Sequence, residues 1–174
     1  NMNNEISSVQ VYNNSNCSGG PVSGNWHADY YESHDYWWDP DNPNRWICDE
    51  DLSGPTLDKN YGTNAPCGGM SGDNWVGDYN ATIDFPSGTY VFRVEHDDGL
   101  KLWLNGQSIA DRGGSGSAYV CPARQLSGNN NLRAKLKEDG GDAKIKVIWS
   151  TDTSPCQPPV ANFDAWPQTG TPPL

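Results

Sequence analysis

Two acidic turns carry the residues of this chain that are most able to do chemistry. Asp97 and Asp98 are adjacent, and Gly99, whose backbone can adopt angles that other residues avoid, follows them. Two neighbouring carboxylates repel each other unless a positive charge lies between them. A hard cation such as Ca²⁺, which takes about six to eight oxygen ligands, would relieve that repulsion. On spacing alone, a polar turn that caps a hairpin explains the pair equally well.

The second acidic turn lies nearer the C-terminus. Residues 138–142 read Glu-Asp-Gly-Gly-Asp and separate two segments in which apolar and polar residues alternate. Alternation with a period of two predicts β-strands, so this turn also joins two strands. Asp139 and Asp142 are equally well explained as solvent-facing turn residues.

Aromatic residues offer another kind of chemistry, because their faces pack well on the apolar faces of sugar rings. Trp37, Trp38 and Trp46 are close in the sequence and form a candidate stacking platform for a ligand. The same residues would also serve to cover the core or a partner domain. His96 precedes the aspartate pair and is a candidate ligand contact, although a lone histidine is more often structural.

The sequence gives little support for an enzyme. It contains no G-x-S-x-G or H-E-x-x-H pattern. Two carboxylates can hydrolyse a glycoside, but neighbours on one turn are poorly placed to flank a bond from opposite sides. The glycine-rich residues 113–117 lack the lysine and the helix of a phosphate-binding loop. We therefore expect no catalytic residues.

Charge and composition restrict the partners. The 174 residues include 22 acidic and 11 basic side chains, for a formal net charge of −11. This balance argues against nucleic acid, because phosphate contacts need a basic patch. No run of about 18 apolar residues occurs, so we expect no insertion into a membrane.

Short strands are the elements expected to position these residues. The alternating segments are 26–31, 78–85, 89–95, 100–104, 107–111, 131–137 and 143–149. Pro86-Ser87-Gly88 predicts a turn, and residues 32–74 predict a long loop without a clear period. The pattern predicts an all-β fold, an antiparallel β-sandwich or barrel with long disulfide-held loops.

The five cysteines indicate disulfides and therefore a secreted or cell-surface protein. No C-x-x-C pair and no histidines at zinc-ligand spacing accompany them. Because five is odd, one thiol is free or its partner lies outside the chain. The sequence alone leaves the connectivity open. Our first expectation is Cys48–Cys67, which closes a turn-rich loop, and our second is Cys17–Cys156, which staples the two ends of the domain.

Several stretches resemble the N-terminal β-barrel domain of anthrax protective antigen, a family that also occurs in yeast flocculins, bacterial adhesins and glycosidases. The stretches run from Trp75 to Tyr79, from Phe85 to Phe92 and from His96 to Gly106. Residues 26–31 and 144–149 look like the first and last strands of the family. The resemblance covers about residues 26–150.

This resemblance implies a β-sandwich with a calcium site. Lectins of the family bind Ca²⁺ through two consecutive aspartates joined by a cis peptide, which here would be Asp97 and Asp98. A second loop adds side-chain and carbonyl oxygens, and it matches the turn at 138–142. Sugar hydroxyls then fill the open coordination positions. The implied metal ligands are Asp97, Asp98, Asp139, Gly140 and Asp142.

Composition also divides the chain into parts. We expect an N-terminal extension or edge strand at 1–25, the β-barrel domain at 26–150 and a proline-containing linker at 151–159. Residues 160–174 resemble the start of a PKD-type repeat, an immunoglobulin-like module. The chain would then be part of a longer protein.

Two functions follow from these signals. The first is a calcium-dependent carbohydrate-binding module, a lectin or adhesin of an exported multidomain protein, with a glycan or cell-surface polysaccharide as its partner. The second is a structural or assembly module of a surface fibre or extracellular filament, in which Ca²⁺ only stabilises the fold. The odd cysteine fits self-association in such an assembly.

Overall fold

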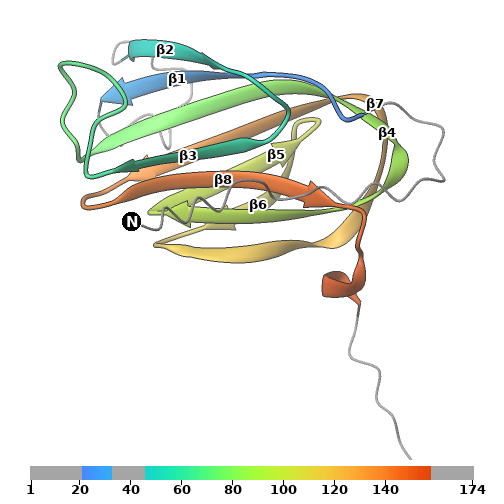
Figure 1. The fold of residues 1–174 in the computed structure, drawn as a ribbon. Helices are drawn as coiled ribbons and strands as arrows, with labels where there is room; N and C mark the ends of the chain where they lie inside the picture. Colours follow the sequence, from blue (N-terminus) through green and yellow to red (C-terminus); the bar gives the residue numbers. More distant parts are fainter. Residues whose placement is uncertain (1–20, 33–45, 158–174) are drawn as a thin grey trace, which may run out of the picture.

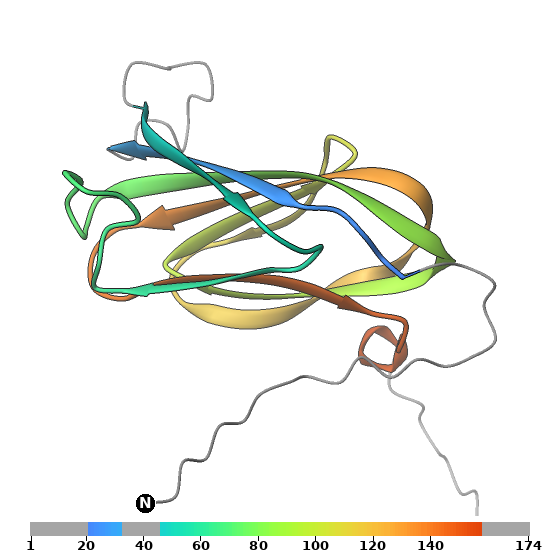
Figure 2. The same cartoon turned by 45° about the horizontal axis from the view of Figure 1, so that its top comes forward.

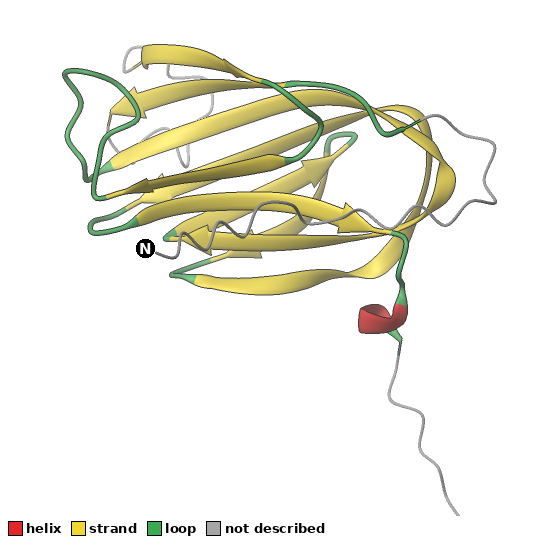
Figure 3. Ribbon diagram, in the orientation of Figure 1, coloured by secondary structure: helices red, strands yellow, loops and turns green. Residues whose placement is uncertain are grey.

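The computed structural model describes residues 21–32 and 46–157 of the chain. These residues form antiparallel strands and a short 3-10 helix (Figures 1 and 3), which confirms the predicted all-β fold. The elements are β1 (Trp26–Glu32), β2 (Trp46–Leu52), β3 (Leu57–Gly62), β4 (Trp75–Asp97), β5 (Gly99–Leu104), β6 (Gln107–Arg112), β7 (Gly116–Glu138), β8 (Ala143–Ser150) and η2 (Ser154–Cys156).

Two long strands, β4 and β7, join the layers of the sandwich. Each has 23 residues, and they pair with each other along most of their length. One layer has the strand order β2-β1-β4-β7-β5-β6. In the other layer β8 pairs with the C-terminal part of β4, and β3 pairs with β8. Both long strands curve from one layer into the other (Figures 1 and 2).

The predicted turn at 86–88 is wrong, because β4 continues through it as a bulge. The pairing of β4 with β7 shifts register between Phe85 and Gly88. Pro86 has no N–H to offer to the ladder, and its carbonyl accepts a hydrogen bond from the Tyr90 hydroxyl at 2.8 Å. Proline is tolerated in a sheet at edges and bulges, so the residues that suggested a turn instead bend a continuous strand.

The segment 32–74 is likewise not one long loop, since its described part contains β2 and β3. β2 has no fully buried residue, and in β3 only Leu57 is buried. Strands of this kind show no clear alternation of apolar and polar residues. They form because β1 and β8 offer them open edges for pairing.

Two disulfides close loops at different places. Cys48–Cys67 is present, which confirms our first expectation. Cys17–Cys156 is wrong, because Cys156 pairs with Cys121, with 5.4 Å between the Cα atoms. After β8 the chain forms the helix η2, which contains Cys156 and contacts β7. Cys17 lies outside the described residues.

The core is aromatic and follows the two-residue period of the strands. From Asn80 to Phe85 the side chains of β4 are alternately exposed and buried. Each fully buried apolar side chain contributes about 1.5–3 kcal/mol relative to its exposed state. The largest fully buried aromatic residues are Trp26, Tyr30, Trp75, Tyr79, Phe85 and Phe92. This period decides which side chains reach the outer face of the sheet.

Some expectations fall on residues that the structure does not describe. These are Trp37 and Trp38, most of the N-terminal extension, the end of the linker and the PKD-like segment 160–174. Ser23 forms an isolated bridge with Asp84 of β4. Among the described residues there is no helix with the length and apolar character that a membrane span needs.

Candidate functional site

Both acidic turns lie at one end of the sandwich. β4 ends at Asp97 and β5 begins at Gly99, so Asp98 alone connects these two strands. β7 ends at Glu138 and β8 begins at Ala143. Because β4 pairs with β8 and β5 pairs with β7, the two turns are adjacent. We call the site formed by Asp73, Asp97, Asp98 and residues 138–142 the acidic rim.

Direct hydrogen bonds join the parts of the acidic rim. The backbone N–H of Asp139 donates to Oδ2 of Asp98 at 2.8 Å. The backbone N–H of Gly141 donates to Oδ1 of Asp73, just before β4, at 3.2 Å. The peptide between Asp97 and Asp98 is cis, as the family resemblance implies. Three segments far apart in the sequence are therefore held together around the aspartate pair.

Negative charge accumulates at the acidic rim. The pKa of Glu138 is raised to about 7, first by burial and then by the charges of Asp98, Asp97 and Asp73, against a backbone hydrogen bond from Gly140 that lowers it. Burial, followed by the charges of Asp98 and Asp142, also raises the pKa of Asp97. These shifts show that the carboxylates are close enough to disfavour each other's ionisation.

The lysines beside the two turns form ion pairs with acidic residues other than Asp97 and Asp98. Lys137 Nζ is 2.7 Å from Oδ1 of Asp139, whose side chain is half-exposed. Lys144, which pairs with Asp97 in the β4–β8 ladder, directs its ammonium to Glu95 at 2.7 Å. The carboxylate of Asp139 therefore already has a cationic partner, while the backbone N–H of Asp139 donates its hydrogen bond to Asp98.

The donor set of the acidic rim fits a hard cation. Carboxylates and turn carbonyls are the oxygen ligands that Ca²⁺ prefers. Among the described residues, however, no three side chains of His, Cys, Asp or Glu are gathered closely enough to form a metal cluster. A cation here would therefore use the Asp97–Asp98 pair together with backbone oxygens, or side chains that rotate toward it.

His96 supports the aspartate turn from inside. Its ring is nearly buried, with 6% exposure. Nδ1 lies 2.6 Å from the carbonyl oxygen of Asp98 and 2.8 Å from that of Gly114. Both partners accept, so Nδ1 carries the proton and donates to them. In this arrangement His96 holds the turn at 97–99 in position.

Trp46 is not brought together with the aspartates. Trp46 of β2 pairs with Tyr31 of β1, Tyr31 with Val76 of β4, and Val76 with Lys137 of β7. Three strand spacings, or about 14 Å, therefore separate Trp46 from β7. Its indole N–H donates to Asp29 at 3.1 Å, and the residue is 48% exposed. As a ligand contact, Trp46 would belong to a different part of the surface.

Two acidic residues of the acidic rim, Glu138 and Asp73, are missing from the ligands expected from sequence. The alternation of the sequence could have identified Glu138. Leu132, Ala134 and Leu136 face the core, and the same two-residue period turns Glu138 inward. Asp73 carries no such signal. Its position depends on how the loop before β4 folds onto the turn at 138–142.

Comparisons with known proteins agree with this fold. The family model described as PA14 domain matches residues 34–161. An anti-sigma factor domain-containing protein from Clostridium clariflavum superposes with a TM-score of 0.61 and 23% identity, over 75% of this chain and 44% of that one. This chain therefore spans less than half of that structure. No curated protein matches the chain.

Two further structures are similar to this chain. The Epithelial Adhesin 9 A domain from Candida glabrata, in complex with Galβ1-4GlcNAc, has a TM-score of 0.53 and 13% identity, over 79% of this chain and 87% of that one. A PA14 sugar-binding domain from an RTX adhesin has a TM-score of 0.52 and 14% identity, over 73% and 89%. At these identities the similarity shows a common fold.

Proposed function

This chain belongs to the PA14 domain family, and from that premise we propose that it is a calcium-dependent carbohydrate-binding module. The observation that carries the proposal is the acidic rim, where Asp98, next to Asp97, accepts a hydrogen bond from the turn at 138–142. The charge of Asp98 raises the pKa of both Asp97 and Glu138, and a cation placed among these carboxylates would favour their ionised forms.

Each part of the acidic rim has a proposed role. Asp97 and Asp98 would hold Ca²⁺ through their carboxylates, and Asp139, Gly140 and Asp142 would add side-chain or carbonyl oxygens. The backbone N–H of Asp139 fixes the orientation of the Asp98 carboxylate. Ca²⁺, when bound, would supply open coordination positions for neighbouring sugar hydroxyls.

The choice of a sugar as ligand rests on the structural neighbours. One of them is an adhesin domain in complex with Galβ1-4GlcNAc, and another is described as a sugar-binding domain. Both have this chain's fold, and extending their ligand class to this chain is an argument by analogy. We propose a glycan or cell-surface polysaccharide as the partner, and a binding role rather than a catalytic one.

An exported location also belongs to the proposal. The two disulfides are typical of proteins that fold outside the cytosol. The adhesin neighbours are consistent with a surface or secreted protein. We propose that this chain is a module of such a protein, and that further domains follow it or precede it.

The first experiment asks whether the acidic rim binds calcium. Protein stripped with EDTA is titrated with CaCl₂ in a calorimeter, and heat of binding with a stoichiometry near one is expected. The double variant Asp97→Asn/Asp98→Asn should lose this heat. Asp84→Asn, an exposed aspartate of the same strand, is the matched control and should keep it. A wild-type titration without heat would refute the calcium site.

The second experiment tests the ligand. A glycan array probed with the calcium-loaded protein should show binding that EDTA abolishes and that the double variant lacks. Heat of calcium binding in the calorimeter together with a glycan array that shows no binding would instead favour the structural or assembly function, in which the ion only stabilises the fold. Sedimentation of the calcium-loaded protein would then reveal polymers.

A further inference from the structure

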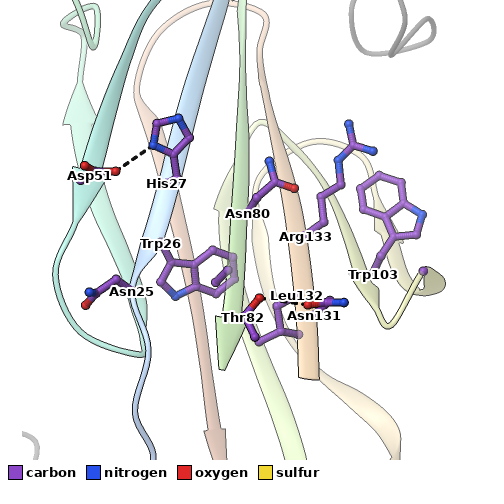
Figure 4. Close-up of a pocket in the computed structure, with 12 residues that line it drawn as sticks. Asn25, Trp26, His27, Asp51, Asn80, Thr82, Trp103, Asn131, Leu132 and Arg133 are labelled. Atoms are coloured by element: carbon purple, nitrogen blue, oxygen red, sulfur yellow. Dashed lines mark hydrogen bonds and ion pairs between the residues drawn. The ribbon is translucent and has the colours of Figure 1, made fainter. Parts of the chain in front are cut away.

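A polar groove crosses the outer face of the layer β2-β1-β4-β7-β5-β6 and passes over the interior of the long strands β4 and β7 (Figure 4). Its volume is about 610 Å³. Five of these strands and the turn after β5 contribute to it. The lining residues on which the argument depends are His27, Asn80, Thr82, Trp103, Asn131 and Arg133.

Strand register explains the shape of the groove. One wall is a row of directly paired residues from five neighbouring strands, namely Asp51, His27, Asn80, Arg133 and Trp103. The other wall contains the paired residues Thr82 and Asn131. Between the walls, Trp26, Ala81 and Leu132 are paired and direct their side chains into the core, so backbone forms the floor. At about 4.8 Å between strands, the longer wall extends over about 19 Å.

Trp103 stands at one end of this wall with its ring supported from one side. The guanidinium carbon of Arg133 lies over the indole, 5.6 Å from the ring centre. Arg133 is itself fixed by Asp78, to which Nε and Nη2 donate at 2.9 and 2.5 Å. Asp78 is only 2% exposed. The ring is therefore held in place before any ligand arrives, which lowers the entropy cost of stacking.

The paired charges make an anionic ligand a poor fit for the groove. The Arg133 guanidinium already binds Asp78 through two hydrogen bonds. His27 Nδ1 is 2.8 Å from Asp51, and its Nε2 is 3.7 Å from Asp29. The whole chain also has a net charge of −11. A neutral ligand avoids repulsion from this background.

Amide and hydroxyl groups complete the surface. Asn80, Thr82 and Asn131 are all exposed. The Thr82 hydroxyl donates to Oδ1 of Asn131 at 3.0 Å, which leaves the Nδ2 amide of Asn131 directed elsewhere. Donors and acceptors therefore alternate over short distances. Sugar hydroxyls, each both a donor and an acceptor, match such a surface.

We propose that this groove is a second carbohydrate site, which binds a neutral polysaccharide chain laid across the strands without any metal ion. Trp103 would stack on a sugar ring, and Asn80, Thr82 and Asn131 would bond its hydroxyls. Arg133 precedes Glu138 by five residues in β7, so about 17 Å of strand separates the groove from the acidic rim. The two sites therefore act independently, and the groove holds a polymer while the rim binds its own ligand.

Affinity electrophoresis in excess EDTA tests this proposal, because the chelator removes any contribution of the acidic rim. The gels contain mixed-linkage β-glucan, arabinoxylan, galactomannan or dextran, with polygalacturonate as the anionic comparison. At least one neutral polymer should retard the wild-type chain. Trp103→Ala should weaken that retardation by up to about tenfold, the loss of one stacked ring. Asp97→Asn/Asp98→Asn should leave it unchanged.

Matched variants separate a binding defect from a folding defect. Tyr119→Ala removes an aromatic side chain of β7 that is 49% exposed and outside the groove, and this variant should bind as the wild type does. If near-ultraviolet circular dichroism shows that Trp103→Ala is unfolded, Asn80→Ala decides, with an expected loss of severalfold. The proposal is overturned if no neutral polymer retards the wild type, if only polygalacturonate does, or if the folded groove variants are retarded as strongly as the wild type.

Discussion

The acidic rim and the groove handle charge in opposite ways. At the rim, burial and the nearby charge of Asp98 raise the pKa of both Asp97 and Glu138. In the groove, Arg133 is bound by Asp78 and His27 by Asp51. Carboxylates at the rim therefore disfavour ionisation of their neighbours, whereas the charges named in the groove are paired within the chain.

The two regions also differ in how they are built. Turns and a loop form the acidic rim, and single hydrogen bonds such as that from Asp139 to Asp98 connect them. Residues inside strands form the groove, and the ladders of four strand pairs set their spacing. Substitutions should therefore cost stability in the groove and relieve strain between charges at the rim. The following predictions test this difference.

The largest effect is expected for Arg133→Met. The substitution keeps an apolar side chain beside Trp103 but removes the guanidinium from Asp78, which is 2% exposed. The Arg133 side chain is partly exposed, but its loss leaves the buried carboxylate of Asp78 without this cation, which should lower the free energy of unfolding by about 3 kcal/mol. Urea denaturation measures the loss.

Lys137→Met is the matched control for Arg133→Met. It removes a cation that pairs with the half-exposed Asp139, so the loss should stay below about 1 kcal/mol. Equal losses for the two variants would contradict the difference in charge balance between the two regions.

The disulfide Cys48–Cys67 should affect both regions. Cys48 lies in β2 with Asp51 of the groove, and Cys67 lies in the loop that leads to Asp73 of the acidic rim. Cys48→Ser/Cys67→Ser removes a crosslink over 19 residues, and the free energy of unfolding should fall by about 3 kcal/mol. Calcium titration and affinity electrophoresis should both show weaker binding.

Cys121→Ser/Cys156→Ser provides the comparison for that disulfide variant. It should destabilise the chain by a similar amount, because it also removes one crosslink. Both binding activities of the protein that remains folded should be kept. Loss of binding in this variant alone would show that the assignment of the two loops is wrong.

Glu138→Gln should stabilise the metal-stripped protein above neutral pH. The pKa of Glu138 is raised from 4.5 to about 7, so between these values the folded state holds a proton that the unfolded chain releases. The free energy of unfolding of the wild type should therefore fall as pH rises through this window, by up to about 3 kcal/mol. Denaturation in EDTA from pH 4 to 8 should show a flatter profile for the variant.

Glu95→Gln should act in the opposite sense. Lys144 lowers the pKa of Glu95, so the ionised form stabilises the fold above the unfolded-state pKa, and this contribution is lost as pH falls through the folded-state value. The variant should be less stable than the wild type at pH 7. If both variants shift stability in the same direction, the charge assignment at this end of the sheet is wrong.

The smallest effect concerns His27. Its pKa is raised above 6.5, first by the hydrogen bond with Asp51 and then by the charges of Asp29, Asp51 and Asp49. The contribution to stability is complete below pH 6.5 and disappears as pH rises through the folded-state pKa. Proton NMR titration should show the raised pKa, and Asp51→Asn should lower it. An unchanged pKa of His27 in this variant would show that Asp51 does not form the hydrogen bond with His27 in the wall of the groove.

The alternation of apolar and polar residues was sufficient to predict a strand wherever that strand has one buried and one exposed face. Residues 26–31, 100–104 and 143–149 all lie in strands, as the alternating pattern predicts. It failed at Pro86, where a bulge and a turn have the same composition, and at β2, which buries no face completely. It also left Cys156 with the wrong partner, because a short helix redirects the chain.

The sequence by itself determined that the chain forms an all-β domain and that adjacent carboxylates occupy two of its turns. Only the tertiary structure decided that Asp73 joins the acidic rim and that Asp51, His27, Asn80, Arg133 and Trp103 form one row. The physical reason is that register between distant strands depends on the simultaneous packing of all of them, and a shift of one residue would turn every side chain to the opposite face.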